Sequence, residues 1–339
     1  MPLKASSGPI VGDHDVVLLD LDGVVYLGAD PVPGAAEAIG RLRAAGHRVA
    51  FVTNNASLAA AEVARRLESV GVPAASTDVV TSAQAAAVLL AARLPAGAAV
   101  LVLGAPSLAD EVAAVGLSPV SDADSAPQAV VNGYSDQLCY ADFCEAGLAL
   151  RAGAWWVATN LDATIPTARG LQPGNGAITA LLEKASGRRP VSAGKPHPPL
   201  LTEAVRRTGA CSPLFVGDRL DTDIAGAAAA GMDSALVLTG VADPRALLAA
   251  GPTERPTYLA GELGGLLEPH PLTRCSRAEA SCRTWRAFLD ADVLRVRGQG
   301  DPLDGVRAAA ALAWAYADRA GHAVPAVDGL PGVTTLRGA

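Results

Sequence analysis

The segment Val16-Val17-Leu18-Leu19-Asp20-Leu21-Asp22-Gly23-Val24 carries the strongest indication of the fold. Its first four residues are apolar, and such a short run favours a buried strand. Two carboxylates follow where that strand ends. If the backbone stays extended there, Asp20 and Asp22 point to the same side. Ligands of parallel sheets bind beyond the carboxyl ends of the strands, so this acidic pair marks a candidate site.

Similar apolar runs alternate with alanine-rich helical stretches along most of the chain. The expected strands are residues 49–53, 79–81, 100–103, 129–131, 155–159, 214–217 and 235–238. The expected helices are residues 35–45, 59–70, 83–92, 140–152, 176–185 and 199–208. Short continuous apolar strands separated by helices indicate parallel sheets that are covered on both faces. The body of the chain is therefore predicted to be an α/β protein.

Composition excludes several classes of protein. The chain has 339 residues, of which 50% are hydrophobic, so it can bury two sizeable cores and is not expected to be disordered. Its 27 basic and 34 acidic residues give a net charge of −7, which argues against nucleic-acid and anionic-membrane partners. The most apolar window, residues 85–105, is interrupted by Arg93, Pro95 and Gly97, so no membrane insertion is expected.

The cysteines and the first residues bear on location. Residues 1–12 contain one lysine and no apolar segment, so no secretory signal is expected. The five cysteines form no CxxC motif and lie at no zinc-site spacing from histidine. We interpret them as reduced, buried thiols of a cytoplasmic protein. They are Cys139, Cys144, Cys211, Cys275 and Cys282.

Two further polar motifs could bind a phosphate group. Thr53-Asn54-Asn55 follows a predicted strand, where a hydroxyl and backbone N–H groups can hold an anion. The structural alternative is a helix N-cap, which threonine and asparagine also favour. Lys195 lies between a glycine and a proline, and its charge could neutralise a phosphoryl group. The alternative there is a solvated loop lysine.

A second acidic motif, Asp218-Arg219-Leu220-Asp221-Thr222-Asp223, follows the strand predicted at residues 214–217. Two carboxylates five residues apart after a strand suit Mg²⁺, which proteins hold with one or two carboxylates and waters. The glycine and the final glutamate of a calcium EF-hand loop are missing.

The first acidic pair, Asp20 and Asp22, also has a structural alternative. Aspartate and glycine are common in surface turns, so this segment could be such a turn.

The order of these four motifs resembles the haloacid dehalogenase superfamily of aspartyl-phosphate phosphatases, over residues 13–269. It is most similar to the C2-type cap subgroup, which includes nitrophenyl-phosphatases and phosphoglycolate and pyridoxal-phosphate phosphatases. Thr159–Asp162 and Pro173–Gly176 look like the cap of that subgroup. The alanine-rich body and the C-terminal extension look most like the actinobacterial glycerol-3-phosphate phosphatases.

The resemblance implies a role for each motif residue. Asp20 is the nucleophile and a Mg²⁺ ligand, and Asp22 is the general acid and base that also offers Mg²⁺ its carbonyl. Asp218 binds Mg²⁺ directly, and Asp223 belongs to the outer shell of the metal. Thr53, Asn54, Asn55 and Lys195 bind the phosphate group. The implied reaction is Mg²⁺-dependent hydrolysis of a small phosphate monoester, first of all glycerol 3-phosphate, through an aspartyl-phosphate. Phosphoglycolate, pyridoxal phosphate and nucleotides remain alternative substrates.

The expected fold is a Rossmann-like parallel-sheet core with an inserted α/β cap domain and a small C-terminal α+β extension. The core comprises residues 1–85 and 190–269, the cap residues 86–189 and the extension residues 270–339. In the cap, Tyr134, Asn160, Asp162 and Ile165 are candidates for contact with the leaving group, and Ser57 could line the phosphate end. For each, ordinary loop capping or packing is the structural alternative. The expected partner is a small phosphate ester, and caps of this subgroup often pair, so a homodimer is also considered.

Three other functions compete with hydrolysis. A phosphotransferase would pass the phosphoryl group to a second alcohol. In the extension, Arg295-Val296-Arg297-Gly298-Gln299-Gly300 fits the pyrophosphate loop R-x-x-G-x-G of N-acetyltransferases, although the extension is about half the length of such a domain. Within the extension, residues 281–296 could supply one or two strands, and Asp301 is the expected N-cap of a helix. A non-catalytic scaffold would not need all four motifs together.

Overall fold

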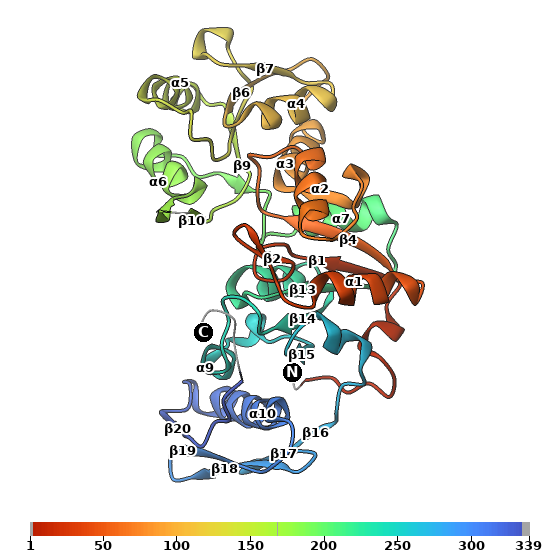
Figure 1. The fold of residues 1–339 in the computed structure, drawn as a ribbon. Coiled ribbons are helices and arrows are strands. Elements are labelled where there is room, and N and C mark those ends of the chain that lie inside the picture. The colour runs from red at the N-terminus through yellow and green to blue at the C-terminus, as the bar shows by residue number, and fades with distance from the viewer. Residues whose placement is uncertain (1–2, 168, 334–339) are drawn as a thin grey trace. The chain divides into compact units, whose positions relative to one another are not determined.

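The structure is a computed structural model that describes residues 3–167 and 169–333 (Figure 1). The chain divides into two compact units, Met1–Val49 with Ala210–Ala339, and Ala50–Gly209. It passes from one unit to the other within β4 (Arg48–Thr53) and again after α7 (Pro199–Thr208). The domain limits expected from the sequence stay predictions. The second compact unit includes α7, which the sequence analysis placed in the core.

The first unit contains four parallel strands in the order β15-β14-β13-β1. They are β1 (Val16–Leu19), β13 (Pro213–Gly217), β14 (Asp233–Val237) and β15 (Tyr258–Ala260). All four side chains of β1 are buried, as its unbroken apolar run predicts. The other elements are α1 (Ala35–Ala44), α8 (Ala225–Ala229), α9 (Pro244–Ala249) and the antiparallel pair β2 (Tyr26–Leu27) and β3 (Asp30–Pro31).

The second unit contains two groups of parallel strands. β4 pairs with β5 (Val79–Thr81), and a five-stranded sheet has the order β12-β9-β8-β6-β7. Its strands are β6 (Ala99–Leu103), β7 (Ser118–Val120), β8 (Ala129–Asn132), β9 (Trp155–Ala158) and β12 (Val191–Ser192). The helices besides α7 are α2 (Ala60–Ser69), α3 (Ser82–Ala91), α4 (Pro106–Ala114), α5 (Tyr140–Arg151) and α6 (Asn175–Ser186). An antiparallel pair, β10 (Thr164–Thr167) and β11 (Gly170–Pro173), completes the unit.

The predicted α/β class is confirmed, and the expected strands and helices of the body are present with ends that differ by two residues at most. The interpretation of the cysteines is only partly correct. All five thiols are free, but only Cys282 is buried. Cys139 is the N-cap of α5 and is exposed, because a single cysteine carries no pattern that reveals its side of an element. Within the described residues, no helix has the length and apolar character needed to span a membrane.

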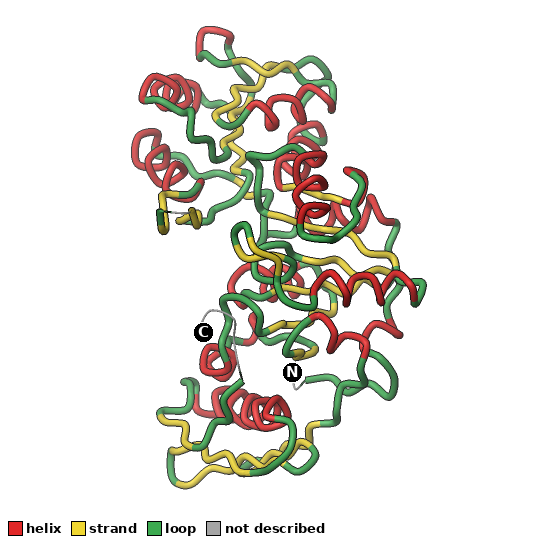
Figure 2. The backbone as a smooth tube through the Cα atoms, viewed as in Figure 1, coloured by secondary structure: helices red, strands yellow, loops and turns green. Residues whose placement is uncertain are grey.

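Residues 273–328 form a small α+β module of the first unit, here called the C-terminal module (Figure 2). Its sheet has the order β16-β17-β18-β19-β20 and is antiparallel except for the last pair. The strands are β16 (Thr273–Cys275), β17 (Glu279–Cys282), β18 (Trp285–Asp290), β19 (Val293–Arg297) and β20 (Ala326–Asp328). β16 and β20 were not predicted, because neither Thr-Arg-Cys nor Ala-Val-Asp forms the apolar run that indicates a buried strand.

One long helix, α10 (Pro302–Ala320), packs against this sheet. Asp301 is its N-cap, as predicted, and its carboxylate accepts the Leu303 N–H at 2.9 Å. The buried residues of α10 share one apolar cluster with residues of β14, α9 and β15. The C-terminal module is therefore joined to the parallel sheet by a common core.

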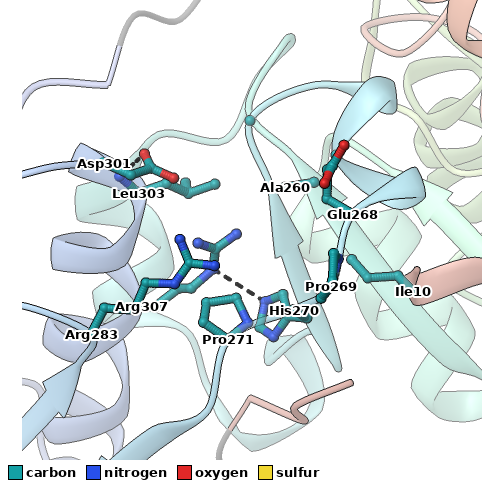
Figure 3. Close-up of a pocket in the computed structure, with 12 residues that line it drawn as sticks. Ile10, Ala260, Glu268, Pro269, His270, Pro271, Arg283, Asp301, Leu303 and Arg307 are labelled. Atoms are coloured by element: carbon teal, nitrogen blue, oxygen red, sulfur yellow. Dashed lines mark hydrogen bonds between the residues drawn. The ribbon is translucent and has the colours of Figure 1, made fainter. Parts of the chain in front are cut away.

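A polar contact lies at one end of this shared core, beside a pocket of about 220 Å³ (Figure 3). Arg307 of α10 donates to the Leu259 carbonyl at 2.8 Å, to Nε2 of His270 at 3.2 Å and to Asp304 at 2.6 Å. Nε2 of His270 also accepts the Leu259 N–H at 3.1 Å. Burial, helped by the Arg307 charge, lowers the pKa of His270 to about 4.

This pKa shift predicts how stability depends on pH. The unfolded chain takes up a proton on His270 near pH 6.5, whereas the folded chain does so only near pH 4. The stabilisation by neutral His270 is therefore complete above pH 6.5 and is lost as the pH falls to 4, by about 3 kcal/mol. His270→Gln keeps an acceptor for Arg307 but does not titrate, so its free energy of unfolding should fall less over this range. Urea unfolding at pH 7 and pH 4.5 measures the difference.

The control is His322→Gln, which removes an exposed histidine of the same unit. This variant should retain the pH dependence of the wild type. Equal pH dependence in the wild type and both variants would contradict the role of His270.

Candidate active site

Three carboxylates meet at the carboxyl ends of two neighbouring strands. Asp20 follows β1, Asp218 follows β13, and Asp223 lies in the π-helical turn Leu220–Ile224. Oxygen atoms of the three side chains lie within 4.8 Å of one another, although the residues are only 8%, 1% and 1% exposed. Like charges this close repel strongly when water is excluded. The donor set, made only of carboxylate oxygens, fits a hard divalent cation.

The backbone of the acidic motif holds Asp223 in place. Its Oδ2 accepts the N–H groups of Asp218 at 3.1 Å and Arg219 at 3.0 Å. A Cβ atom at Gly217 would lie 2.3 Å from the Cβ of Asp223, so only glycine leaves room for this turn. Asp221, which the sequence left without a role, is exposed and pairs with Arg219 at 2.8 Å. The hydrogen bond to Arg219 lowers the pKa of the Asp221 carboxyl.

A segment that sequence reasoning missed, residues 239–242, holds the carboxylate of Asp218. The Val241 N–H donates to Oδ2 of Asp218 at 2.6 Å, and the Ala242 N–H donates to its carbonyl at 3.0 Å. A Cβ atom at Gly240 would lie only 1.9 Å from the same Oδ2. Residues 239–242 follow the predicted strand at 235–238, so the rule that sites form beyond strand ends could have identified them.

The two carboxylates of the first motif have different surroundings. Asp20 is buried, and its N–H donates to the Val216 carbonyl at 2.9 Å, which fixes it against β13. Asp22 is exposed. The turn after it is closed by the Gly23 N–H, which donates to the Tyr26 carbonyl at 2.8 Å, and Gly23 has a φ of 87°. One carboxylate is thus fixed inside the protein, and the other is open to solvent.

In the second unit, Thr53 ends β4 and is buried. Its Oγ1 accepts the Asn55 N–H at 3.1 Å. The Asn55 side chain in turn accepts the N–H and the hydroxyl of Ser57 at 2.8 and 2.9 Å, and the Leu58 N–H at 3.2 Å. Asn55 and Ser57 therefore shape the turn after β4. The alternative of a helix N-cap is wrong for Asn55, because the N-cap of α2 is Ala59.

The Asn54 side chain joins three segments of the second unit. Its Oδ1 accepts the Lys195 N–H at 2.8 Å, and its Nδ2 donates to the Lys195 carbonyl and to Oδ2 of Asp162, both at 3.1 Å. The Asn54 carbonyl accepts Nδ2 of Asn160 at 2.8 Å. Lys195 is only 3% exposed, so the reading as a solvated loop lysine is wrong.

Hydrogen bonds from the first residues of α6 hold the loop that carries Asn160 and Asp162. Nδ2 of Asn175 donates to the Asn160 carbonyl at 2.7 Å, and the Gly176 N–H donates to the Asp162 carbonyl at 2.8 Å. A Cβ atom at Gly176 would lie 2.3 Å from the Leu161 carbonyl oxygen, so glycine is required for this approach. Tyr134 and Ile165 are half-buried and take no part in these hydrogen bonds.

The acetyltransferase-like motif has surroundings that disfavour a pyrophosphate. Arg295 pairs with Asp290 at 2.9 Å and with Asp328 at 2.8 Å. At the start of α10, the Asp301 carboxylate accepts the Leu303 N–H, and Asp304 lies in the first turn. These two acidic residues place negative charge where a pyrophosphate would need the positive end of the helix. The geometry therefore gives no support for acetyl transfer.

Comparison with protein families identifies three matching regions. Residues 17–118 match the model of haloacid dehalogenase-like hydrolases, and residues 192–266 match a second model of HAD-hydrolase-like proteins. Residues 282–330, which cover most of the C-terminal module, match a GCN5-related N-acetyltransferase-like domain.

Individual proteins are similar over most of the chain. The D-glycerol 3-phosphate phosphatase of Mycobacterium tuberculosis is 46% identical over 90% of this chain and 87% of its own length. The acid sugar phosphatase of Staphylococcus saprophyticus is 37% identical over 68% of this chain and 88% of its own.

Solved structures of phosphatases are also similar to this chain. The crystal structure of the glycerol phosphate phosphatase from Mycobacterium tuberculosis in complex with magnesium has a TM-score of 0.86 at 44% identity, over 95% of each chain. The 4-nitrophenylphosphatase of Thermotoga maritima has a TM-score of 0.70 at 33% identity, over 76% of this chain and 98% of its own. From its sequence, its fold and these relatives, this chain belongs to the family of haloacid dehalogenase-like hydrolases.

Proposed function

We propose that this chain is a Mg²⁺-dependent phosphatase that hydrolyses glycerol 3-phosphate to glycerol and inorganic phosphate. The observation that carries the proposal is the buried group of Asp20, Asp218 and Asp223, whose mutual repulsion calls for a divalent cation. The proposal is also supported by the relative named a D-glycerol 3-phosphate phosphatase, which is 46% identical to this chain.

The side chains of Asp20 and Asp218, with the carbonyl of Asp22, would hold the Mg²⁺ ion. Asp223 would orient the waters bound to the ion. One carboxylate oxygen of Asp223 already accepts two backbone N–H groups, so this side chain is held in place. When bound, the ion offsets the repulsion between the Asp20 carboxylate and an approaching phosphate group. Mg²⁺ prefers oxygen ligands and keeps several waters, and this donor set suits both preferences.

Asp20 and Asp22 divide the chemistry between them. An oxygen of Asp20 forms a bond to phosphorus as the bond from phosphorus to the alcohol oxygen breaks, which leaves an aspartyl-phosphate. Asp22 gives its proton to the departing alcohol and then takes one from the water that attacks phosphorus. This second step releases phosphate and restores both side chains. Its exposed position lets Asp22 exchange protons with solvent.

The second unit supplies groups suited to a phosphate. Thr53 offers a buried hydroxyl, and Lys195 offers a buried cation whose backbone is held on both sides by Asn54. A cation in such a dry place stabilises negative charge more strongly than it would in water. We assign Thr53, the Asn54 N–H and Lys195 to phosphate binding. Asn55 and Ser57 act by shaping the turn that presents them.

Asp162 and Asn160 are the proposed contacts for the alcohol part of the substrate, with Tyr134 and Ile165 as weaker candidates. An ionised carboxylate accepts hydrogen bonds from hydroxyl groups, which glycerol 3-phosphate offers. The same carboxylate would repel the carboxylate of phosphoglycolate. Asp162 therefore favours a hydroxylated substrate over an acidic one.

Two expectations about the setting of the protein stay predictions. One is a cytoplasmic location, with which the five free thiols agree. The other is pairing of two copies, which the sequence suggested through the family resemblance alone. Light scattering of the purified protein would measure the mass in solution.

The reaction is tested by phosphate release from a panel of esters. Glycerol 3-phosphate should release phosphate with Mg²⁺ and not with EDTA, faster than phosphoglycolate, pyridoxal phosphate or nucleotides. Asp20→Asn removes the nucleophile and should lower the rate at least about a thousandfold. Its unfolding transition should stay close to that of the wild type. A near-native rate in this variant would contradict the assignment, and adding a second alcohol such as ethanol would reveal a phosphotransferase by a phosphorylated product.

The metal site is tested at a glycine rather than at a ligand. In Gly240→Ala the new methyl group would press on Oδ2 of Asp218 and displace it. Mg²⁺ affinity, measured by titration calorimetry, should fall about 10- to 100-fold. Gly261→Ala is the matched control, because nothing lies within 4 Å of a Cβ atom there. If both variants bind Mg²⁺ like the wild type, Asp218 is not a metal ligand.

The contact between Asn54 and Asp162 is tested by a double-mutant cycle. Asn54→Asp places a second carboxylate beside Asp162 and should lower kcat/KM about 10- to 100-fold. Asp162→Asn keeps an acceptor for Asn54 and should have a smaller effect. In the double variant an amide again faces a carboxylate, so part of the loss should be recovered. Strict additivity of the two effects would show that the contact carries no function.

A further inference from the structure

The segment from Leu238 to Leu248 links two parts of the first unit. At its start, the Val241 N–H binds the carboxylate of Asp218, and the Ala242 N–H binds the Asp218 carbonyl. At its end is α9, a helix of six residues. A helix this short is not stable without packing partners. The position of the segment, and with it the orientation of the Asp218 carboxylate, therefore depends on what covers it.

The C-terminal module is what covers it. Leu238, Ala242, Leu247 and Leu248 are buried in one cluster with the side chains of α10. These side chains include Val306, Ala310, Ala313 and Trp314. In the described part of the first unit, α9 and α10 are in direct contact. The apolar side of the segment that holds Asp218 is thus completed by α10.

Trp314 makes the most specific contact of this interface. It is 2% exposed, and its indole N–H donates to the Leu247 carbonyl at 2.9 Å. Arg255 lies over the indole ring at 5.5 Å and pairs with Asp318 of the same helix at 2.8 Å. Trp314 therefore fixes the backbone of α9 by a hydrogen bond as well as by packing.

The opposite end of the interface is fixed by Arg307, whose guanidinium binds the carbonyl of Leu259 in β15. β15 pairs with β14, the strand that leads into the segment 238–248. α10 therefore binds both the segment 238–248, through Leu247, and β15, which pairs with the strand that leads into this segment. The hydrogen bonds of Trp314 to Leu247 and of Arg307 to Leu259 set the position of α10 along the sheet.

We propose that the C-terminal module positions the metal ligand Asp218, with Trp314 as the positioning residue. Through Leu247, Trp314 holds the segment 238–248, and the Val241 N–H of this segment sets the direction of the Asp218 carboxylate. The inference rests on the proposed Mg²⁺ site. It assigns a role in metal affinity to a module whose sequence matches an acetyltransferase-like domain.

The experiment measures the Mg²⁺ dissociation constant by titration calorimetry. Trp314→Phe keeps most of the ring volume but loses the N–H that binds Leu247, and it should weaken Mg²⁺ binding about three- to tenfold. Trp314→Leu removes the ring as well and should weaken binding further. At saturating Mg²⁺, the KM for glycerol 3-phosphate should stay close to that of the wild type, because the second unit is unchanged.

The chain offers a matched control in the second unit. Trp156 is also 2% exposed, and its indole N–H donates to Oδ1 of Asn132 at 2.8 Å. Trp156→Phe removes an equivalent hydrogen bond and should destabilise the fold to a similar extent. It should leave the Mg²⁺ dissociation constant unchanged, because this tryptophan has no contact with the segment 238–248.

Each outcome decides between specific positioning and general packing. Weaker Mg²⁺ binding in Trp314→Phe alone supports the proposal. Unchanged binding in Trp314→Phe, or equal weakening in Trp156→Phe, overturns it. Thermal unfolding of each variant shows that the measured protein is folded, and Trp314→Phe remains available if Trp314→Leu does not fold. A wild type that binds no Mg²⁺ would instead refute the metal site itself and thus the proposed function.

Discussion

Electrostatic repulsion among three buried carboxylates is the constraint on which the first unit is built. Oxygen atoms of Asp20, Asp218 and Asp223 lie within 4.8 Å of one another, with little access to water. Such a group destabilises the folded state unless a cation neutralises its negative charge. The protein keeps the group by fixing two of the three carboxylates: Asp223 by two backbone N–H groups, and Asp218 by the Val241 N–H. The same arrangement that would destabilise an empty site favours the binding of a divalent cation.

Close packing of backbone around these carboxylates explains the glycines of the motifs. Gly217 and Gly240 lie where any Cβ atom would overlap an aspartate side chain. In the second unit, Asn54 has an equivalent organising role, since its amide holds both backbone groups of Lys195 and the carboxylate of Asp162. The groups that we propose for binding the phosphate and the alcohol part of the substrate are therefore positioned together in that unit. The C-terminal module adds a third support, through the segment that carries Val241.

Much of this could be predicted from the sequence, because apolar runs reveal buried strands and polar residues that follow them reveal the edge where ligands bind. Asp20, Asp218 and Asp223 were identified in this way and lie together. Contacts made by backbone groups could not be predicted. Val241 contributes only its N–H to Asp218, and Trp314 binds a carbonyl, so neither residue type indicates its role. β16 and β20 were missed because their residues form no apolar run, and the exposure of four cysteines was missed because a lone thiol carries no pattern.

The most direct measurement is the position of a bound divalent cation in crystals of this protein. Mn²⁺ has the charge and oxygen preference of Mg²⁺, and its anomalous scattering locates it without assumptions about the ligands. We predict one strong peak bounded by the carboxylates of Asp20 and Asp218, and loss of that peak in Asp20→Asn crystals grown under the same conditions. A peak elsewhere, or a structure in which the three carboxylates remain together without any cation at millimolar Mn²⁺, would contradict the metal site on which the proposed chemistry depends.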